Sequence, residues 1–436
     1  MISRRKFIQT TSIAGTCFLL TPEISKASFL GSPNNKVVLG MMGTNSRGLY
    51  LAQSFAKIPN VEIGYVCDVD SKVLERTINE IYKQTGKKPH GITDIRKMLE
   101  IKEIDAVVIA APDHWHAPAT IMACQAGKHV YVEKPGSHNP QEGEMAVEAS
   151  KKYKRLVQMG NQSRSFANVQ AMIKELHGGV IGRAYHAKGW YTSNRASIGK
   201  GRQVAVPEHL DYDLWQGPAP RMAFMDSLVP YNWRLSWNWG AGEALSNGTH
   251  ELDVIRWGLG FDYPNKVVST GGRFHFNDDG ETPDTQNILF NFPNNTAAEW
   301  ENRSSNGFNI DKPGRGVVFY GDKGTLFYGS GNGYQVYDSE NKLVKDVKDD
   351  TDKVSPTESL DSFHLKNFID AIRGEASLNC PIETGFKSTL LPQLGNISYR
   401  VDRVLHIDSS NGHILNDPEA AKLWSREYEK GWEVKV

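Results

Sequence analysis

The chain has 436 residues, of which 39% are hydrophobic and 23% are charged. These proportions are typical of a globular protein, and the length allows two domains with separate cores. The 50 basic and 50 acidic side chains cancel, and no long run of either sign occurs, so nothing indicates a nucleic-acid partner or an extended membrane surface.

Residues 1–27 are predicted to be an export leader. The paired Arg4 and Arg5 precede an uncharged stretch from Thr10 to Thr21, and Ser25-Lys26-Ala27 is a suitable cleavage site. A twin arginine before a moderately apolar stretch is typical of the Tat export machinery, which carries folded proteins. We therefore expect a periplasmic protein. The apolar stretch is too short for a stable membrane anchor.

The cysteines do not indicate a disulfide framework. Removal of the leader leaves Cys67, Cys124 and Cys380, an odd number of widely spaced residues without a Cys-x-x-Cys pair. Buried free thiols are the expected state.

The pattern from Val37 onward predicts a dinucleotide site. A short apolar strand, Val37 to Met42, leads into Gly43-Thr44-Asn45-Ser46-Arg47-Gly48 and then a helix. This is Gly-x-Asn-x-x-Gly rather than Gly-x-Gly-x-x-Gly, but asparagine tolerates the left-handed backbone angles of such a turn. Amide groups at the helix start would bind phosphate.

A second strand, Val61 to Cys67, ends in Asp68, twenty residues beyond Gly48. A carboxylate at this spacing can hydrogen-bond an adenosine ribose, and it repels the 2′-phosphate of NADP. The predicted cofactor is therefore NAD.

The alternation continues with a helix from Lys72 to about Gln84 and an apolar strand from Asp105 to Pro112. The polar segment Asp113 to His116 is expected to be a loop that opens the next helix. His114 and His116 beside an aspartate raise the possibility of a metal. No further ligands at recognisable spacing follow, so no metal site is expected.

A buried strand at Val130 to Val132 runs into Glu133-Lys134-Pro135. Proline stops the strand, so Lys134 is expected at its carboxyl end, the edge where parallel sheets bind ligands. A lysine whose pKa is lowered by burial can transfer protons. An incidental surface ion pair is the alternative, but the shared edge with the glycine turn and Asp68 favours a catalytic role.

Residues 36–160 are therefore predicted to form a Rossmann domain, and residues 161–436 a substrate-binding α+β domain. A helix from Asn168 to His177 is followed by alternating segments that predict a large, mostly antiparallel open sheet. These segments are Gly182–Tyr191, Lys266–Phe274, Asn287–Phe292, Ala297–Glu301, Gly316–Tyr320 and Gly324–Tyr328. Helices at Phe363–Arg373 and Gly385–Leu405 are expected to return and brace the nucleotide domain.

Five of the ten tryptophans fall between Trp215 and Trp257. Flat aromatic faces suit a sugar ring, although each tryptophan taken singly is more readily a core residue. His250 precedes an apolar helical stripe, so we expect it in the first turn of a helix, with a pKa lowered by that position.

Taken together, four motifs resemble the Gfo/Idh/MocA oxidoreductases, the family of glucose-fructose oxidoreductase and inositol dehydrogenase. They are the glycine turn with Arg47-Gly48, Cys67-Asp68, Pro112 to His116, and Gly127-Lys128-His129-Val130 leading to Glu133-Lys134-Pro135. The resemblance implies that Lys134 lies by the nicotinamide and the reacting hydroxyl. The implied cofactor-binding set is Gly43, Asn45, Ser46, Arg47, Gly48, Asp68, Pro112, Trp115, His116, Glu133, Lys134 and Asn161.

The resemblance also implies a homo-oligomer formed through the C-terminal sheet. In the family an Asp-x-x-x-His pair stands beside the lysine. Here Ser246 occupies the aspartate position and His250 is retained, which leaves Glu243 or Glu251 as possible replacements.

These observations predict an exported, NAD-dependent oxidoreductase that acts on a carbohydrate CH-OH group. Lys134 would move the hydroxyl proton with the help of His250, and the cofactor would be loaded before export and seldom leave. The expected sugar contacts are Gln162, Arg164, Tyr191, Arg234 and His250.

Two alternatives stay open. One is a glycosidase that acts by transient oxidation and elimination, as in glycoside hydrolase family 109. The pattern of that family lacks a lysine at the Glu-Lys-Pro position, so Lys134 favours a dehydrogenase. The other is a non-catalytic sugar-binding protein that keeps the cofactor as a structural element.

Overall fold

The computed structural model describes residues 36–308, 313–348 and 356–436, so the expected leader lies outside the described residues. Residues Val37–Val436 form one compact unit. This unit contains all the helices and strands named below.

The first sheet is parallel and has the strand order β3-β2-β1-β4-β5-β6. Its strands are β1 (Val37–Met42), β2 (Val61–Cys67), β3 (His90–Ile92), β4 (Ala106–Ile109), β5 (His129–Val132) and β6 (Val157–Met159). The intervening helices are α1 (Arg47–Phe55), α2 (Ser71–Thr85), α3 (Ile95–Leu99), α4 (Asp113–Gln125) and α5 (Pro140–Lys152). The strand order reverses between β1 and β4, which creates the crevice where such folds bind ligands.

The second sheet has nine strands in the order β14-β13-β12-β11-β7-β10-β9-β8-β15. They are β7 (Ala184–Thr192), β8 (Lys266–Gly272), β9 (Thr285–Phe292), β10 (Thr296–Arg303), β11 (Arg315–Gly321), β12 (Gly324–Tyr328), β13 (Tyr334–Asp338), β14 (Leu343–Val347) and β15 (Leu405–His406). Among the described residues, its strands pair antiparallel except β7 with β10. Buried and exposed residues alternate along β9 and β10, so one face of the sheet is covered.

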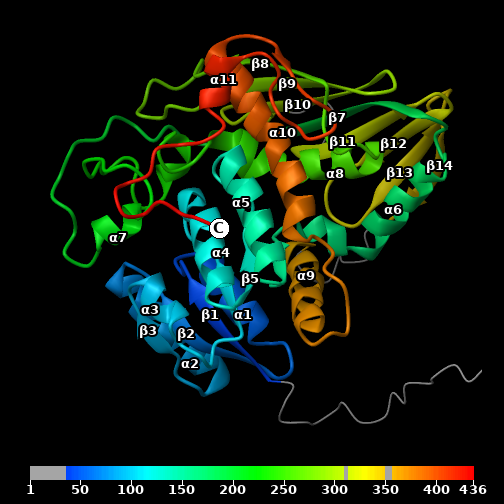
Figure 1. The fold of residues 1–436 in the computed structure, drawn as a ribbon. Coiled ribbons are helices and arrows are strands. Elements are labelled where there is room, and N and C mark those ends of the chain that lie inside the picture. The colour runs from blue at the N-terminus through cyan, green and yellow to red at the C-terminus, as the bar shows by residue number, and fades with distance from the viewer. Residues whose placement is uncertain (1–35, 309–312, 349–355) are drawn as a thin grey trace, which may run out of the picture. The chain divides into compact units, whose positions relative to one another are not determined.

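Helices cover that face (Figure 1). They include α6 (Ala167–His177), α8 (Thr249–Leu259) and α10 (Ile382–Val401), which share one hydrophobic core with the strands. Helix α9 (Pro356–Ile372) instead packs Leu365, Phe368 and Ile369 into the core formed by β1 and α1.

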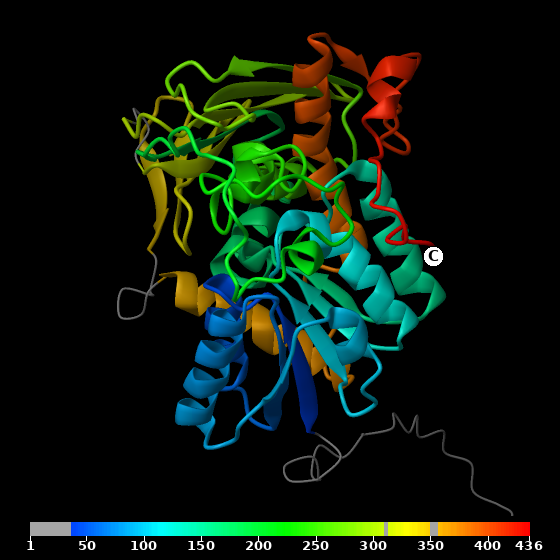
Figure 2. The same cartoon turned by 90° about the vertical axis from the view of Figure 1, so that its left-hand side faces the viewer.

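The remaining elements are short. They are η2 (Gln162–Ser165), α7 (Tyr212–Gln216), η3 (Asn232–Leu235), the π-helix η4 (Ala244–Gly248) and α11 (Pro418–Lys422). Figure 2 shows the long connection that carries α7 reaching down beside the first sheet.

The predicted fold class is confirmed: a Rossmann domain is followed by an α/β domain with a large, mostly antiparallel sheet. The three cysteines of the described chain are free and buried, as expected. No helix among the described residues is long and apolar enough to cross a membrane.

Some predicted boundaries were wrong. Asp113 to His116 is not a loop, because α4 already begins at Asp113, directly after Pro112. The last long helix ends at Val401, where Asp402 adopts left-handed backbone angles, and Leu405–His406 then joins the sheet as β15.

Candidate cofactor and substrate site

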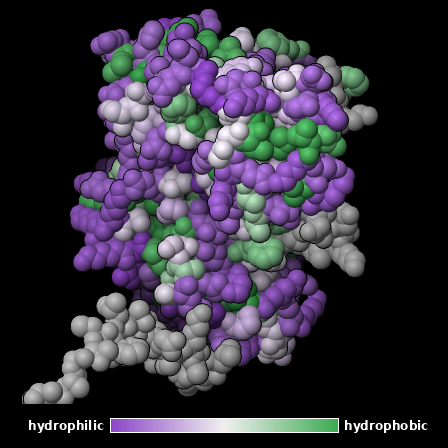
Figure 3. Space-filling model, turned by 90° about the vertical axis from the view of Figure 1, so that its right-hand side faces the viewer, coloured by the Kyte–Doolittle hydropathy of each residue, from purple (hydrophilic) through white to green (hydrophobic). Residues whose placement is uncertain are grey.

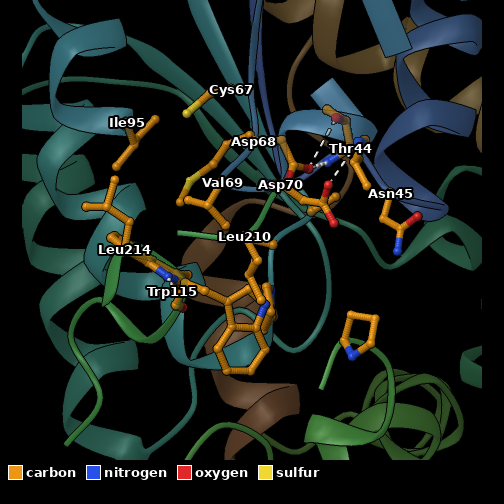
Figure 4. A pocket seen from close by; sticks show the side chains of 18 of the residues that line it. Thr44, Asn45, Cys67, Asp68, Val69, Asp70, Ile95, Trp115, Leu210 and Leu214 are labelled. Atoms are coloured by element: carbon orange, nitrogen blue, oxygen red, sulfur yellow. Dashed lines mark hydrogen bonds between the residues drawn. The ribbon is translucent and has the colours of Figure 1, made fainter. Parts of the chain in front are cut away.

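A cleft opens at the carboxyl ends of β1, β2 and β4 and holds about 1060 Å³ of space, part of it open to solvent. One wall comes from the Rossmann domain through Gly43–Arg47, Asp68–Asp70 and Ala110–Pro112. The other comes from residues 210–234, here called the covering segment, through Leu210, Leu214, Trp215, Pro230, Tyr231, Trp233 and Arg234. Figure 4 shows side chains from both walls facing the same space.

The glycine turn has the geometry of a phosphate cradle. Gly43 has a φ of +76°, and a Cβ atom there would lie 2.6 Å from the backbone of Ala111, so only glycine fits. Helix α1 then begins at Arg47, and Ser46 makes no side-chain cap. The first amide groups of α1 therefore remain available for an anion.

Asp68 lies at the end of β2 and is fixed by three hydrogen bonds. Its carboxylate accepts bonds from the Thr44 amide (2.7 Å), the Thr44 hydroxyl (3.2 Å) and the Asp70 amide (3.0 Å) (Figure 4). Burial raises the pKa of Asp68, whereas these bonds favour the ionised form and oppose the rise. Asp68 lines the cleft, and its contact with a ribose stays a prediction.

Lys134 is the second residue after β5, and its amine donates a hydrogen bond to the main-chain oxygen of Ser246 at 2.5 Å. That oxygen belongs to the π-helix η4. Burial lowers the pKa of Lys134, and the nearby carboxylates of Glu133 and Asp113 oppose this effect. A lysine whose pKa is lowered by burial loses its proton more readily and can then act as a proton acceptor.

The pKa of His250 is lowered well below its ordinary value, as predicted. The predicted cause was wrong. His250 lies near the start of α8, but η4 runs directly into α8 and leaves no free helix end. Burial is the main cause, and the positive charges of Lys134, Arg315 and Arg47 add to it.

Neither expected replacement for the missing aspartate is free. Glu243 forms an ion pair with Arg195 at 2.6 Å, and Glu251 forms one with Arg315 at 2.7 Å. The carboxylate near Lys134 that the sequence interpretation missed is Asp113, which is buried. The sequence feature that could have indicated Asp113 is its position directly after Pro112, the end of the predicted apolar strand.

Arg47 contributes both to the cleft and to the surroundings of Lys134, because it binds the neighbouring Glu133. It lines the cleft, and its guanidinium binds Glu133 at 2.7 Å and Asp361 of α9 at 2.8 Å. Asp361 was also missed, because nothing in the local sequence links it to a residue more than three hundred positions away.

The two histidines after Pro112 contact main-chain carbonyls. The His116 ring lies between the oxygens of Pro135 (2.6 Å) and Ala111 (2.7 Å), and His114 Nε2 lies 3.0 Å from the oxygen of Trp215. The Trp115 indole donates to that same oxygen and also lines the cleft. No group of three or more potential metal ligands occurs in the described ranges.

The residues expected to contact sugar are dispersed. Arg234 lines the cleft, with its guanidinium over Tyr231. Tyr191 packs under Arg315, and Gln162 lies near Glu133. The guanidinium of Arg164 is instead engaged by Asp253 at 2.7 Å and lies over Trp257, and both members of the pair are buried. This geometry favours a structural role for Arg164.

A dinucleotide fits the residues present. Asn161 is 1% exposed, and neither polar atom of its side chain has a hydrogen-bond partner within the described residues. Buried amides without partners are rare unless a ligand or water satisfies them. With the glycine cradle and Asp68, this amide is consistent with the class of dinucleotide-binding Rossmann proteins.

Comparison with known families agrees with that class. Residues 37–161 match the profile described as "Oxidoreductase family, NAD-binding Rossmann fold", and residues 201–402 match "Oxidoreductase family, C-terminal alpha/beta domain". The chain therefore belongs to the Gfo/Idh/MocA oxidoreductase family, with NAD as its cofactor. The predicted resemblance is confirmed.

Among curated relatives, a glycosyl hydrolase family 109 protein of Shewanella baltica (strain OS185) is 28% identical over 214 residues. The match covers 44% of this chain and 46% of that relative, so it spans about half of the relative's length. An alpha-N-acetylgalactosaminidase of Shewanella oneidensis is 28% identical over 168 residues, which cover 37% of this chain and 36% of that protein.

Solved structures share the fold. Levoglucosan dehydrogenase in complex with NADH and levoglucosan has a TM-score of 0.67 at 16% identity and covers 85% of this chain and 99% of its own. The WlbA dehydrogenase of Bordetella pertussis, in complex with NADH and UDP-GlcNAcA, has a TM-score of 0.64 at 18% identity, covering 86% and 99%.

Proposed function

We propose that the protein is an exported oxidoreductase that transfers hydride between a carbohydrate hydroxyl carbon and a tightly held NAD. The observation that carries the proposal is the buried Lys134, which lies at the carboxyl end of β5 with a lowered pKa. NAD, when bound, supplies the hydride acceptor. Neutral Lys134 takes the proton of the hydroxyl as the carbon is oxidised and returns it in the reverse direction.

The other residues bind and orient. The amides at the start of α1 hold the pyrophosphate, Asp68 holds the adenosine ribose, and Asn161 contacts the cofactor. His250, kept neutral by burial and nearby cations, hydrogen-bonds the sugar beside Lys134. Arg234 and Tyr191 provide further sugar contacts, which suit the apolar faces and hydroxyl groups of a saccharide.

A glycosidase acting by transient oxidation and elimination is the second candidate. The observation that favours it is the match to glycosyl hydrolase family 109 proteins. In that reaction the same cofactor accepts and returns one hydride, so the protein needs no second redox substrate. A non-catalytic sugar-binding role predicts instead that no saccharide changes the redox state of bound NAD.

Export and assembly complete the proposal. The twin-arginine leader would direct the folded, cofactor-loaded protein to the periplasm. The face of the second sheet that the helices leave open carries the exposed apolar side chain of Leu289 in β9. On the side shown in Figure 3, apolar patches interrupt a largely hydrophilic surface. A second copy of the chain packed on this sheet would cover part of the apolar area.

The deciding experiment is to purify the protein, denature it and identify the released cofactor. The native protein is then offered monosaccharides, inositols and nitrophenyl glycosides, while NADH absorbance and nitrophenol release are measured. A dehydrogenase changes absorbance with a free sugar, and the glycosidase releases nitrophenol without net reduction. Released NADP would contradict the role given to Asp68, and no change with any compound would contradict both enzyme candidates.

A further inference from the structure

A second cavity lies apart from the cofactor cleft and shares no residue with its lining. It holds about 920 Å³ of space, part of it open to solvent. Its walls come from the start of α5, the connection before η4, α10, and the segment after α11. That segment is bound to α5 by a hydrogen bond from the Gln141 amide to the Trp424 oxygen.

Arg426 is the unusual residue of this cavity. Its side chain is only 9% exposed, and its Nε lies 3.1 Å from the Glu142 carboxylate. Its Nη1 and Nη2 make no hydrogen bond of ordinary geometry within the described residues, and the guanidinium lies over the Tyr428 ring, 5.1 Å from its centre. A buried guanidinium with open donors is costly unless a ligand or water accepts from it.

Two buried side-chain amides, like Arg426, each have a polar atom without a hydrogen-bond partner in the described chain. Asn139 caps α5 through its Oδ1, which accepts from the Glu142 amide at 3.1 Å, and its Nδ2 has no partner in the described chain. Gln393 of α10 donates through Nε2 to Ser137, and its Oε1 likewise lacks a described partner. These residues are 6% and 3% exposed.

The polar atoms without a partner indicate which chemical groups a ligand of this cavity would carry. Arg426 Nη1 and Nη2 form a planar pair of donors that matches a carboxylate. Asn139 Nδ2 needs an acceptor and Gln393 Oε1 needs a donor, and hydroxyl groups supply both. Trp237 also lines the cavity. Glu142 is already paired with Arg426, and the exposed Arg400 and Glu427 at the cavity carry opposite charges.

We propose that this cavity is a second binding site, separate from the NAD site, for a polyhydroxylated ligand with one carboxylate group, such as a uronic or aldonic acid. The carboxylate would bind the Arg426 guanidinium, and its hydroxyl groups would bind Asn139 and Gln393.

The test is isothermal titration of the full, cofactor-loaded protein with D-glucuronate, with D-glucose and acetate as comparison ligands. Arg426→Lys keeps the charge beside Glu142 but removes the planar donor pair. Asn139→Asp keeps the Oδ1 that caps α5 and replaces the open donor with a carboxylate. Each is expected to weaken glucuronate binding by about tenfold or more.

Arg403→Lys is the matched control, because Arg403 is exposed and pairs with Asp417 outside the cavity. It should bind glucuronate like the unchanged protein. Equal affinity of all three variants, or binding of glucose or acetate as tight as that of glucuronate, would overturn the proposal. Asn139→Asp keeps the test decisive if Arg426→Lys fails to fold.

Discussion

Lys134 is held by a main-chain carbonyl where the family pattern leads one to expect a carboxylate. A carbonyl oxygen accepts a hydrogen bond from either charge state of the amine and stabilises the charged state less than a carboxylate would. The bond to Ser246 therefore orients the amine and leaves its pKa to burial and to the more distant Glu133 and Asp113. Orientation and protonation are thus controlled by different groups.

Replacing Lys134 with methionine should lower the rate of sugar oxidation by about a hundredfold or more, because the proton acceptor is lost. Lys134→Arg should be similarly inactive, since arginine keeps the charge but does not deprotonate. For the unchanged protein, kcat/KM should rise with pH through a midpoint below 10.5, the ordinary pKa of lysine.

Lys128→Met is the control for that series. Lys128 lies just before β5, and its amine donates to the Ile101 oxygen at 2.7 Å, away from the cleft. Its loss should leave kcat/KM and the pH profile unchanged. Retained turnover in Lys134→Met, with a full content of NAD, would argue against the assigned role.

For single residues, the sequence predicted those positions that are set by neighbouring residues in the chain. Gly43, Asp68 and Lys134 each stand at a strand end within a short motif, so spacing along the chain was sufficient to predict their neighbourhood. The partners Asp361 and Ser246 come from distant segments, and the Ser246 contact depends on a π-helix that no residue pattern indicated. Convergence of this kind is set by tertiary packing.

At the scale of elements, the tryptophan-rich stretch shows what composition can and cannot predict. Each of its tryptophans taken singly was more readily a core residue than a sugar contact, and Trp215 and Trp239 are indeed buried, in a cluster that packs the segment together. Their aromatic composition could not distinguish a core from a binding surface. Leu210 also forms a β-bridge with Asp70, so the segment is fastened to the Rossmann domain beside the cleft.

The Gly217→Ala substitution should weaken the packing of the covering segment against the Rossmann domain. Gly217 has a φ of +46°, and an added Cβ atom would lie 2.0 Å from the indole ring of Trp115, which lines the cleft. We expect NADH to dissociate about tenfold faster or more, since the added atom would force the segment away from Trp115. Stopped-flow fluorescence of the bound nicotinamide would measure this rate.

Gly199→Ala separates crowding from backbone strain. Gly199 also has a positive φ, +70°, but nothing lies within 4 Å of its added Cβ atom. It should lose some stability and keep the original dissociation rate. Equal rates for the two variants would show that the cover does not limit cofactor release.

Across Val37–Val436, buried histidines couple the fold to pH. The His364 ring of α9 hydrogen-bonds the Met159 oxygen of β6 at 2.9 Å and the Ser165 hydroxyl at 2.6 Å. Burial lowers the pKa of His364 to about 4 and that of His138 to about 3. Both rings are therefore neutral in the folded protein at pH values where unfolded histidine already takes up a proton.

Stability should fall as the pH drops from 6.5 towards 4. In this window the unfolded state binds more protons, whereas above 6.5 the two states bind the same number at these sites. Each histidine should contribute at most about 2 kcal/mol between pH 6.5 and 5. Urea unfolding of the unchanged protein and of His364→Gln would measure the loss, and an identical pH slope in both would contradict the prediction.

The central strand of the second sheet has a consequence for the order of assembly. β7 pairs with β10 and β11, which lie about a hundred residues later in the chain, whereas β1 pairs with the very next strand. Closing so long a loop is slow, so the Rossmann sheet is expected to form first. The covering segment lies between β7 and β10. NAD would therefore bind to the Rossmann domain before the second sheet is complete. Completion of that sheet would then bring the covering segment over the bound cofactor.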